Sequence, residues 1–185
     1  PSLLYVGGEN DASVQLLRSH QGPVIMHVAE PPEKYGPGWA WDDYGYSYQV
    51  ERTLLPIYGN RLTFRQDAPQ LAPIIQPSIY SDYVVEDASQ VRLLDRIGEA
   101  NAFTLNTDRI SEYPVETSGP FIVSDYDLQQ ILSSLTEKTL IADYGGEFPS
   151  AYNTLDGVPL DSLYMPLMHD SDNFIAEQLL LQVAA

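Results

Sequence analysis

Two short segments of the 185-residue sequence combine side chains that could do chemistry. The first is Ser171-Asp172-Asn173, which directly precedes an apolar run. Such a triplet is most simply a helix N-cap, because Ser, Asp and Asn accept hydrogen bonds from the free backbone N–H groups of a first helical turn. The alternative is catalytic, since a hydroxyl can relay a proton while an amide two residues further on holds a substrate carbonyl. Taken alone, the triplet favours the cap.

The second segment runs from residue 36 to residue 44 and contains Trp39, Trp41 and two adjacent carboxylates, Asp42 and Asp43. One interpretation is structural: a loop held in place by buried tryptophan, with Asp side chains closing its turns. The other is recognition, in which aromatic walls position one carboxylate to meet the cationic group of a ligand. The segment by itself leaves both interpretations open.

Together, the two segments resemble one protein family. Residues 171–180, SDNFIAEQLL, are similar to the Ser-x-Asn signature of D-alanyl-D-alanine carboxypeptidases of the penicillin-binding-protein 4 type, the S13 peptidase family. Residues 36–44, GPGWAWDDY, followed by Tyr48, are similar to that family's Pro-Gly-Trp-x-Trp-Asp-Asp segment. The two segments stand in the family's order and at about its separation. The likeness extends over most of the chain and is weakest between about residues 66 and 124.

The resemblance implies roles for individual residues. Ser171 would pass a proton to the leaving D-alanine and Asn173 would hold a peptide carbonyl, whereas Asp172 is expected to be a helix N-cap. Asp43 and Tyr48 would help to form a pocket for the free polar end of the peptidoglycan stem. A carboxylate suits that pocket, because the stem's side chain ends in an ammonium group.

The family's mechanism needs two further elements. A Ser-x-x-Lys supplies nucleophile and base, and a Lys-Thr-Gly binds the terminal carboxylate. The sequence has two lysines, Lys34 and Lys138, and neither belongs to such a motif. We therefore expect an internal fragment of a longer carboxypeptidase, inactive alone and not labelled by β-lactams. A divergent relative that lost its chemistry is the alternative.

The resemblance implies that the longer protein is a serine-type D-Ala-D-Ala carboxypeptidase or endopeptidase. It would cleave peptidoglycan stem peptides through an acyl-serine, with no cofactor and no metal, in the periplasm or another extracytoplasmic place, although no signal peptide is apparent in this sequence. The alternative function is a non-catalytic module that binds cell-wall peptides or proteins. Its contact surface would comprise Trp39, Trp41, Asp43 and Tyr48.

The composition narrows the range of partners. Nine Lys and Arg against 26 Asp and Glu give a formal charge of −17, so nucleic-acid binding is not expected. No apolar run approaches the ~18 residues of a membrane span, and the absence of cysteine excludes disulfides and thiolate zinc sites. A calcium loop starting at Asp170 fails, because Phe174, Ile175 and Leu181 occupy its ligand and glycine positions. The three histidines show no metal-ligand spacing.

The resemblance and the hydrophobic pattern together predict a mixed α/β (α+β) fold. Residues 1–65 would form the edge of a β-lactamase/transpeptidase-like domain that includes the Trp loop. Residues 66–158 would form a β-rich inserted region, and residues 159–185 would return to the first domain with the Ser-x-Asn motif.

Three helices are expected from apolar spacing and capping residues. They cover about residues 12–19, with Asn10 or Asp11 as cap, residues 125–137, after Ser124, and residues 174–183. In the last helix a buried face is expected to contain residues that share the i, i+4, i+8 spacing, namely Ile175, Leu179 and Val183.

Strands are expected where short β-leaning runs stand between turn signals. These runs are residues 3–6, 23–29, 54–58, 61–65, 74–86, 102–106 and the region of Val115. Gly59 and Asn60 tolerate positive φ and predict a hairpin-like turn. Residues 91–97 fit either a strand or a short helix, and residues 30–48 are expected to form an irregular loop.

Overall fold

The computed structural model describes residues 6–146, 150–151 and 159–184. Contacts between residues divide the chain into two compact units, which we describe separately. Unit 1 comprises residues 1–36, 52–59 and 123–185, and unit 2 comprises residues 37–51 and 60–122. The chain contains both helices and small sheets, so the predicted mixed α+β class is confirmed. The three segments expected from the sequence, with boundaries at residues 65 and 158, concern a larger domain and stay a prediction.

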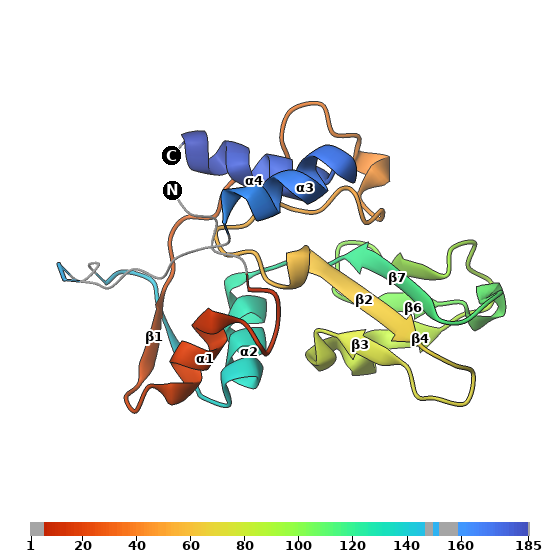
Figure 1. The fold of residues 1–185 in the computed structure, drawn as a ribbon, viewed down its shortest axis with the longest axis horizontal. Helices are drawn as coiled ribbons and strands as arrows, with labels where there is room; N and C mark the ends of the chain where they lie inside the picture. Colours follow the sequence, from red (N-terminus) through yellow and green to blue (C-terminus); the bar gives the residue numbers. More distant parts are fainter. Residues whose placement is uncertain (1–5, 147–149, 152–158, 185) are drawn as a thin grey trace. The chain divides into compact units, whose positions relative to one another are not determined.

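The first part of unit 1 is a two-stranded parallel sheet with two helices. Strands β1 (Val24–His27) and β8 (Leu140–Asp143) pair in parallel. Helix α2 (Asp125–Thr136) packs against β8, and α1 (Ala12–Ser19) packs against α2 (Figure 1). The apolar side chains that α2 buries are Ile131, Leu132 and Leu135, whose i, i+1, i+4 spacing places them on one face of the helix. Both helices and strand β1 are therefore confirmed, whereas β8 was not foreseen.

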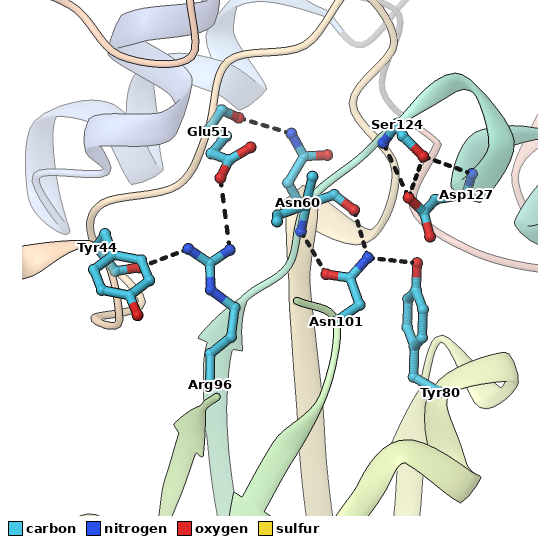
Figure 2. Close-up of polar contacts among 9 residues, drawn as sticks. Tyr44, Glu51, Asn60, Tyr80, Arg96, Asn101, Ser124 and Asp127 are labelled. Carbon is cyan, nitrogen blue, oxygen red and sulfur yellow. Dashed lines mark hydrogen bonds and ion pairs between the residues drawn. The ribbon is translucent and has the colours of Figure 1, made fainter. Parts of the chain in front are cut away.

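Side-chain caps fix where these two helices begin. The Asp11 carboxylate accepts a hydrogen bond from the Ser13 backbone N–H (2.9 Å) at the start of α1. At α2 the Ser124 hydroxyl accepts from the Asp127 N–H (3.1 Å), and the Asp127 carboxylate accepts from the Ser124 N–H (3.2 Å) (Figure 2). This reciprocal pair is a capping box, which satisfies two backbone donors that a helix start otherwise leaves free.

Unit 1 also contains a helical hairpin. Helix α3 (Leu160–His169) packs against α4 (Asn173–Ala184), and residues 170–172 join them. The sequence did not predict α3, because Pro166 lies inside it and a proline removes one backbone hydrogen bond of a helix.

The expected buried face of α4 is wrong. Phe174 and Gln178 are the buried residues, whereas Val183 is 83% exposed and Ile175 and Leu179 are only partly buried. The apolar side chains of α4 itself point to nearly all sides of the helix. Their spacing alone therefore did not identify the face that packs against the rest of unit 1. The buried amide of Gln178 donates to the Thr53 hydroxyl at 3.5 Å.

Most of the strand expected at residues 3–6 lies outside the described residues. Val6 is described, and it forms an isolated parallel bridge with Ile57. The Val6 N–H donates to the Pro56 carbonyl (3.0 Å), and the Tyr58 N–H donates to the Val6 carbonyl (2.9 Å). No regular strand is formed over residues 54–58, so Gly59 and Asn60 turn with the predicted positive φ (60° and 52°) without closing a hairpin.

Unit 2 contains two three-stranded sheets. In the first, β2 (Arg61–Gln66) pairs antiparallel with both β3 (Ile74–Gln76) and β7 (Val115–Pro120). In the second, β6 (Phe103–Leu105) lies between β4 (Val84–Glu86), which is parallel to it, and β5 (Leu94–Arg96), which is antiparallel. Short 3-10 turns occur at η1 (Trp41–Asp43), η2 (Tyr58–Asn60), η3 (Ser78–Tyr83) and η4 (Thr107–Arg109).

The core of unit 2 forms between its sheets. Leu62 and Phe64 alternate along β2 and are fully buried, as is Phe103 on β6. A Leu94 methyl on β5 would lie 3.8 Å from a Cβ at Gly119 on β7, so the two sheets are in contact at this point. The segment at residues 91–97, which fitted either a strand or a short helix, contains strand β5. The long run expected at residues 74–86 is broken into β3 and β4 by η3.

In the part of the chain that the structure describes, no helix is both long enough and apolar enough to cross a bilayer.

Candidate functional site

The structure brings Asp43 and Tyr48 together in unit 2. Successive turns wind the loop between them: the Tyr46 N–H donates to the Asp43 carbonyl (2.9 Å), and the Gln49 N–H donates to the Tyr46 carbonyl (3.0 Å). The Asp43 carboxylate lies close enough to the Tyr48 hydroxyl to raise its pKa. Two side chains five positions apart in the sequence are therefore near each other.

A pair of tyrosine rings stands beside this carboxylate. The rings of Tyr46 and Tyr48 are stacked, with centroids 5.3 Å apart and planes 17° from parallel, and each residue is 42% exposed. Partial burial raises the pKa of Tyr48, and the neighbouring Asp43 carboxylate raises it further. The Tyr48 hydroxyl is therefore harder to deprotonate than an ordinary phenol, and the neighbouring Asp43 side chain is half-buried. A carboxylate beside exposed aromatic rings can bind a cationic group.

Arg92, which lies two residues before β5, also contacts this loop. Its Nη1 donates to the Gly45 carbonyl (2.9 Å), and its Nη2 pairs with the Asp95 carboxylate (2.8 Å). Its guanidinium carbon lies 4.3 Å from the centroid of the Tyr46 ring. The contact of Arg92 was not predictable from the sequence, because nothing in the local pattern relates Arg92 to a loop 47 positions away.

Arg96 forms a second, buried contact with the same loop (Figure 2). Its Nη1 lies 3.6 Å from Glu51 Oε1, and the two side chains are 1% and 6% exposed. Its Nη2 donates to the Tyr44 carbonyl (3.3 Å), and its guanidinium carbon is 4.8 Å from the centroid of the Tyr44 ring. The Glu51 carbonyl accepts from the Asn60 side-chain amide at 3.0 Å. Arg96 thus contacts Tyr44 and Glu51, which precede and follow the stacked tyrosines 46 and 48 in the sequence.

Ser171 lies in the turn between α3 and α4 in unit 1, and Asn173 directly follows that turn. Ser171 is exposed and has a left-handed backbone (φ 52°), and Asn173 is the first residue of α4. The Asp172 carboxylate accepts from the Ile175 N–H at 3.1 Å, so the predicted N-cap at Asp172 is confirmed. The roles expected for Ser171 and Asn173 stay predictions.

An ion pair that was not predicted from the sequence connects α4 to Arg52. Arg52 Nη1 lies 3.6 Å from Glu177 Oε2 on α4. The same guanidinium donates to the carbonyls of Glu33 and Tyr35, and the Arg52 N–H donates to the Lys34 carbonyl at 2.8 Å. Arg52 therefore joins the residues that precede the Trp loop to α4 within unit 1.

The four predicted site residues fall into two pairs. Asp43 and Tyr48 belong to unit 2, and Ser171 and Asn173 belong to unit 1. Of the two tryptophans, Trp39 is partly buried, and the side chain of Trp41 lies outside what the structure describes. Over residues 6–146, 150–151 and 159–184, no cluster of three or more His, Asp or Glu side chains is arranged to hold a metal ion.

Comparison with known proteins shows a likeness to solved structures. No protein-family model matches the chain, and the search of curated proteins found no match. Among solved structures, the chain is similar to penicillin binding protein 4 from Haemophilus influenzae, with a TM-score of 0.48 and 18% sequence identity. The match covers 80% of this chain and 37% of that chain, so this chain spans little more than a third of that protein's length.

Proposed function

We propose that this chain is part of a serine-type D-Ala-D-Ala carboxypeptidase or endopeptidase of the S13 type, an extracytoplasmic enzyme that acts on peptidoglycan stem peptides. In this proposal Asp43 and Tyr48 bind the ammonium end of the stem's side chain. The observation that supports it is the stack of the Tyr46 and Tyr48 rings, with the Asp43 carboxylate near enough to the Tyr48 hydroxyl to raise its pKa. A primary ammonium can pair with the carboxylate while its methylene carbons lie against an aromatic ring.

In the proposed reaction, this chain supplies some of the catalytic residues and the longer protein supplies the others. A serine in a Ser-x-x-Lys motif would attack the penultimate D-alanyl carbonyl, the peptide bond would break, and water would later release the acyl group. Ser171 would pass the proton that the leaving amine takes up, and Asn173 would hold a peptide carbonyl. Since the sequence contains neither Ser-x-x-Lys nor Lys-Thr-Gly, the chain alone is expected to be inactive.

Peptide binding tests the proposal. The probe is Nα-acetyl-lysyl-D-alanyl-D-alanine with a free ε-ammonium, compared with the same peptide acetylated on that nitrogen. We expect the tyrosine ring signals of Tyr46 and Tyr48 to shift in NMR titrations with the charged peptide and not with the acetylated one. Asp43→Asn should weaken binding about tenfold, the equivalent of about 1.4 kcal/mol for one charge-assisted contact.

The matched control is Asp42→Asn, which removes the neighbouring, exposed carboxylate. It should leave the dissociation constant within about twofold, because exposed charges contribute little to a local contact. Equal binding of both peptides, or no binding at millimolar concentration, would contradict the proposed contact.

A non-catalytic module that binds wall peptides is the second candidate. The observation that favours it is that the Asp43–Tyr48 arrangement is formed within unit 2 alone, in a sequence without a nucleophile motif. The gene separates the two candidates. Coding sequence with Ser-x-x-Lys upstream and Lys-Thr-Gly downstream supports the enzyme, and a stop codon soon after Ala185 supports the module.

A further inference from the structure

We propose that Arg92 is the positioning residue of the Asp43–Tyr48 site, holding Gly45 and Tyr46 so that the stacked rings and the carboxylate face a ligand together. The inference rests on the proposed function, because it concerns how well that site binds an ammonium group. Arg92 need not touch the ligand in this role.

The guanidinium of Arg92 connects the loop to the second sheet of unit 2. It donates to the Gly45 carbonyl, stacks on the Tyr46 ring and pairs with Asp95. Asp95 lies on β5 opposite Thr104 of β6, so its carboxylate is held by a paired strand. The Asp95 carboxylate therefore anchors the guanidinium that contacts the loop. A planar guanidinium suits this position because it can donate hydrogen bonds in two directions while one of its faces stacks on an aromatic ring.

The main chain leaves room for this contact at Gly45. Gly45 is buried, and a Cβ there would lie 2.8 Å from Arg92 Nη2 and 3.3 Å from Asp95 Oδ1. A side chain at position 45 would have to displace the guanidinium. Glycine at this position thus permits the close approach of Arg92 to the loop backbone.

The position of Tyr46 determines the site geometry. Its ring stacks on that of Tyr48, and its N–H donates to the carbonyl of Asp43. Both members of the proposed binding pair are therefore in contact with Tyr46. A shift of Tyr46 on loss of Arg92 would separate the stacked wall from the carboxylate.

Charge and positioning predict opposite effects at Arg92. A cation next to the site repels an ammonium ligand, so an Arg92 that acted through its charge alone would weaken binding, and its removal would strengthen it. If Arg92 positions the loop, its removal weakens binding although a repulsive charge has gone. The sign of the change therefore separates the two roles.

The experiment uses four variants of the chain, the charged lysyl-D-alanyl-D-alanine peptide and its ε-acetylated form. Arg92→Gln removes the guanidinium, Arg92→Lys keeps the charge without the planar fork, and Gly45→Ala displaces the guanidinium without changing Arg92. The matched control is Arg65→Gln, which breaks an exposed Arg–Asp pair on β2 (Arg65 Nε to Asp67 Oδ1, 2.9 Å). Two-dimensional NMR spectra confirm that each variant is folded.

We expect the dissociation constant to rise about five- to tenfold in Arg92→Gln and Gly45→Ala, with little rescue in Arg92→Lys and no change in Arg65→Gln. In the absence of peptide, the nuclear Overhauser contacts between the rings of Tyr46 and Tyr48 should weaken in the same three variants. Unchanged or tighter binding by Arg92→Gln, or undisturbed ring contacts, would overturn the inference. A wild-type chain that does not distinguish the two peptides would instead overturn the proposed function.

Discussion

Arg96 and Glu51 form a charge pair that is almost completely removed from water, since their side chains are 1% and 6% exposed. Burying two charges costs much of what their attraction gains, so such a pair is weak as a source of stability while it is intact. Removing one partner is different, because the other buried charge then loses its counter-charge. The pair therefore makes the loop arrangement around Tyr44 sensitive to single substitutions.

Replacing Arg96 with methionine should lower the free energy of unfolding of unit 2 by about 3–5 kcal/mol, since the buried Glu51 carboxylate would lose the positive charge of Arg96. Urea unfolding followed by tyrosine fluorescence measures the loss. The double variant Arg96→Met, Glu51→Gln should recover part of the lost free energy of unfolding, because the second change removes the buried negative charge of Glu51. A loss below about 1 kcal/mol in the single variant would show that the pair is solvated.

The acid–base behaviour of Tyr48 provides a second prediction at the level of single residues. Its pKa is raised above 10.0 by partial burial and by Asp43, so the folded chain holds this proton more tightly than the unfolded chain does. The resulting stabilisation is present below the unfolded pKa and is lost as the pH rises through the folded pKa.

In Asp43→Asn the pKa of Tyr48 should fall towards the ordinary value, since the negative charge that opposes the phenolate is gone. Titration of the Tyr Cζ signals by ¹³C NMR, with Tyr48→Phe to assign the signal, measures the change. An unchanged pKa would show that Asp43 and Tyr48 are not in contact in solution.

At the level of elements, helix starts were predictable and long-range contacts were not. Asp11 and Ser124 cap helices that the sequence predicted, because a capping residue before apolar spacing is a local signal. Helix α3 was not predicted, because Pro166 lies inside it. The buried face of α4 was predicted wrongly, because apolar residues occur on nearly all sides of that helix.

The candidate site shows the same division. The resemblance of the Trp-containing segment named Asp43 and Tyr48 together, and their role in binding stays a prediction. The contacts of Arg92 with Gly45 and of Arg96 with Tyr44 did not, because they join residues 47 and 52 positions apart through the pairing of β5 with its sheet. Local patterns contain no record of such pairing.

The turn between α3 and α4 stores backbone strain at Ser171. A left-handed backbone costs about 1 kcal/mol for a residue with a Cβ and almost nothing for glycine. Ser171→Gly should therefore leave the melting temperature unchanged or raise it, whereas Ser171→Val should lower it, because a β-branched side chain fits this conformation poorly. Thermal unfolding by circular dichroism tests both.

If Ser171→Gly destabilised the chain by more than about 1 kcal/mol, the hydroxyl would have a structural role in the turn. If it is neutral, this variant removes the hydroxyl without damaging the fold. It then becomes the appropriate substitution for testing proton relay in the longer enzyme.

At the scale of the whole chain, we expect no acylation by β-lactams. β-Lactams acylate the serine of Ser-x-x-Lys, and neither Lys34 nor Lys138 completes that motif. Incubation with a fluorescent penicillin should therefore give no labelled band on a denaturing gel. A band that survives denaturation and disappears on preincubation with unlabelled penicillin would reveal a serine nucleophile outside the motif.

The close approach of Arg92 to the loop backbone also predicts how this surface varies among homologues. A methyl group at position 45 would meet Arg92 Nη2 at 2.8 Å, so the two positions are sterically coupled. In an alignment of related sequences, residues 45 and 92 should covary: arginine at 92 should accompany glycine at 45, and alanine or serine at 45 should accompany a shorter residue at 92.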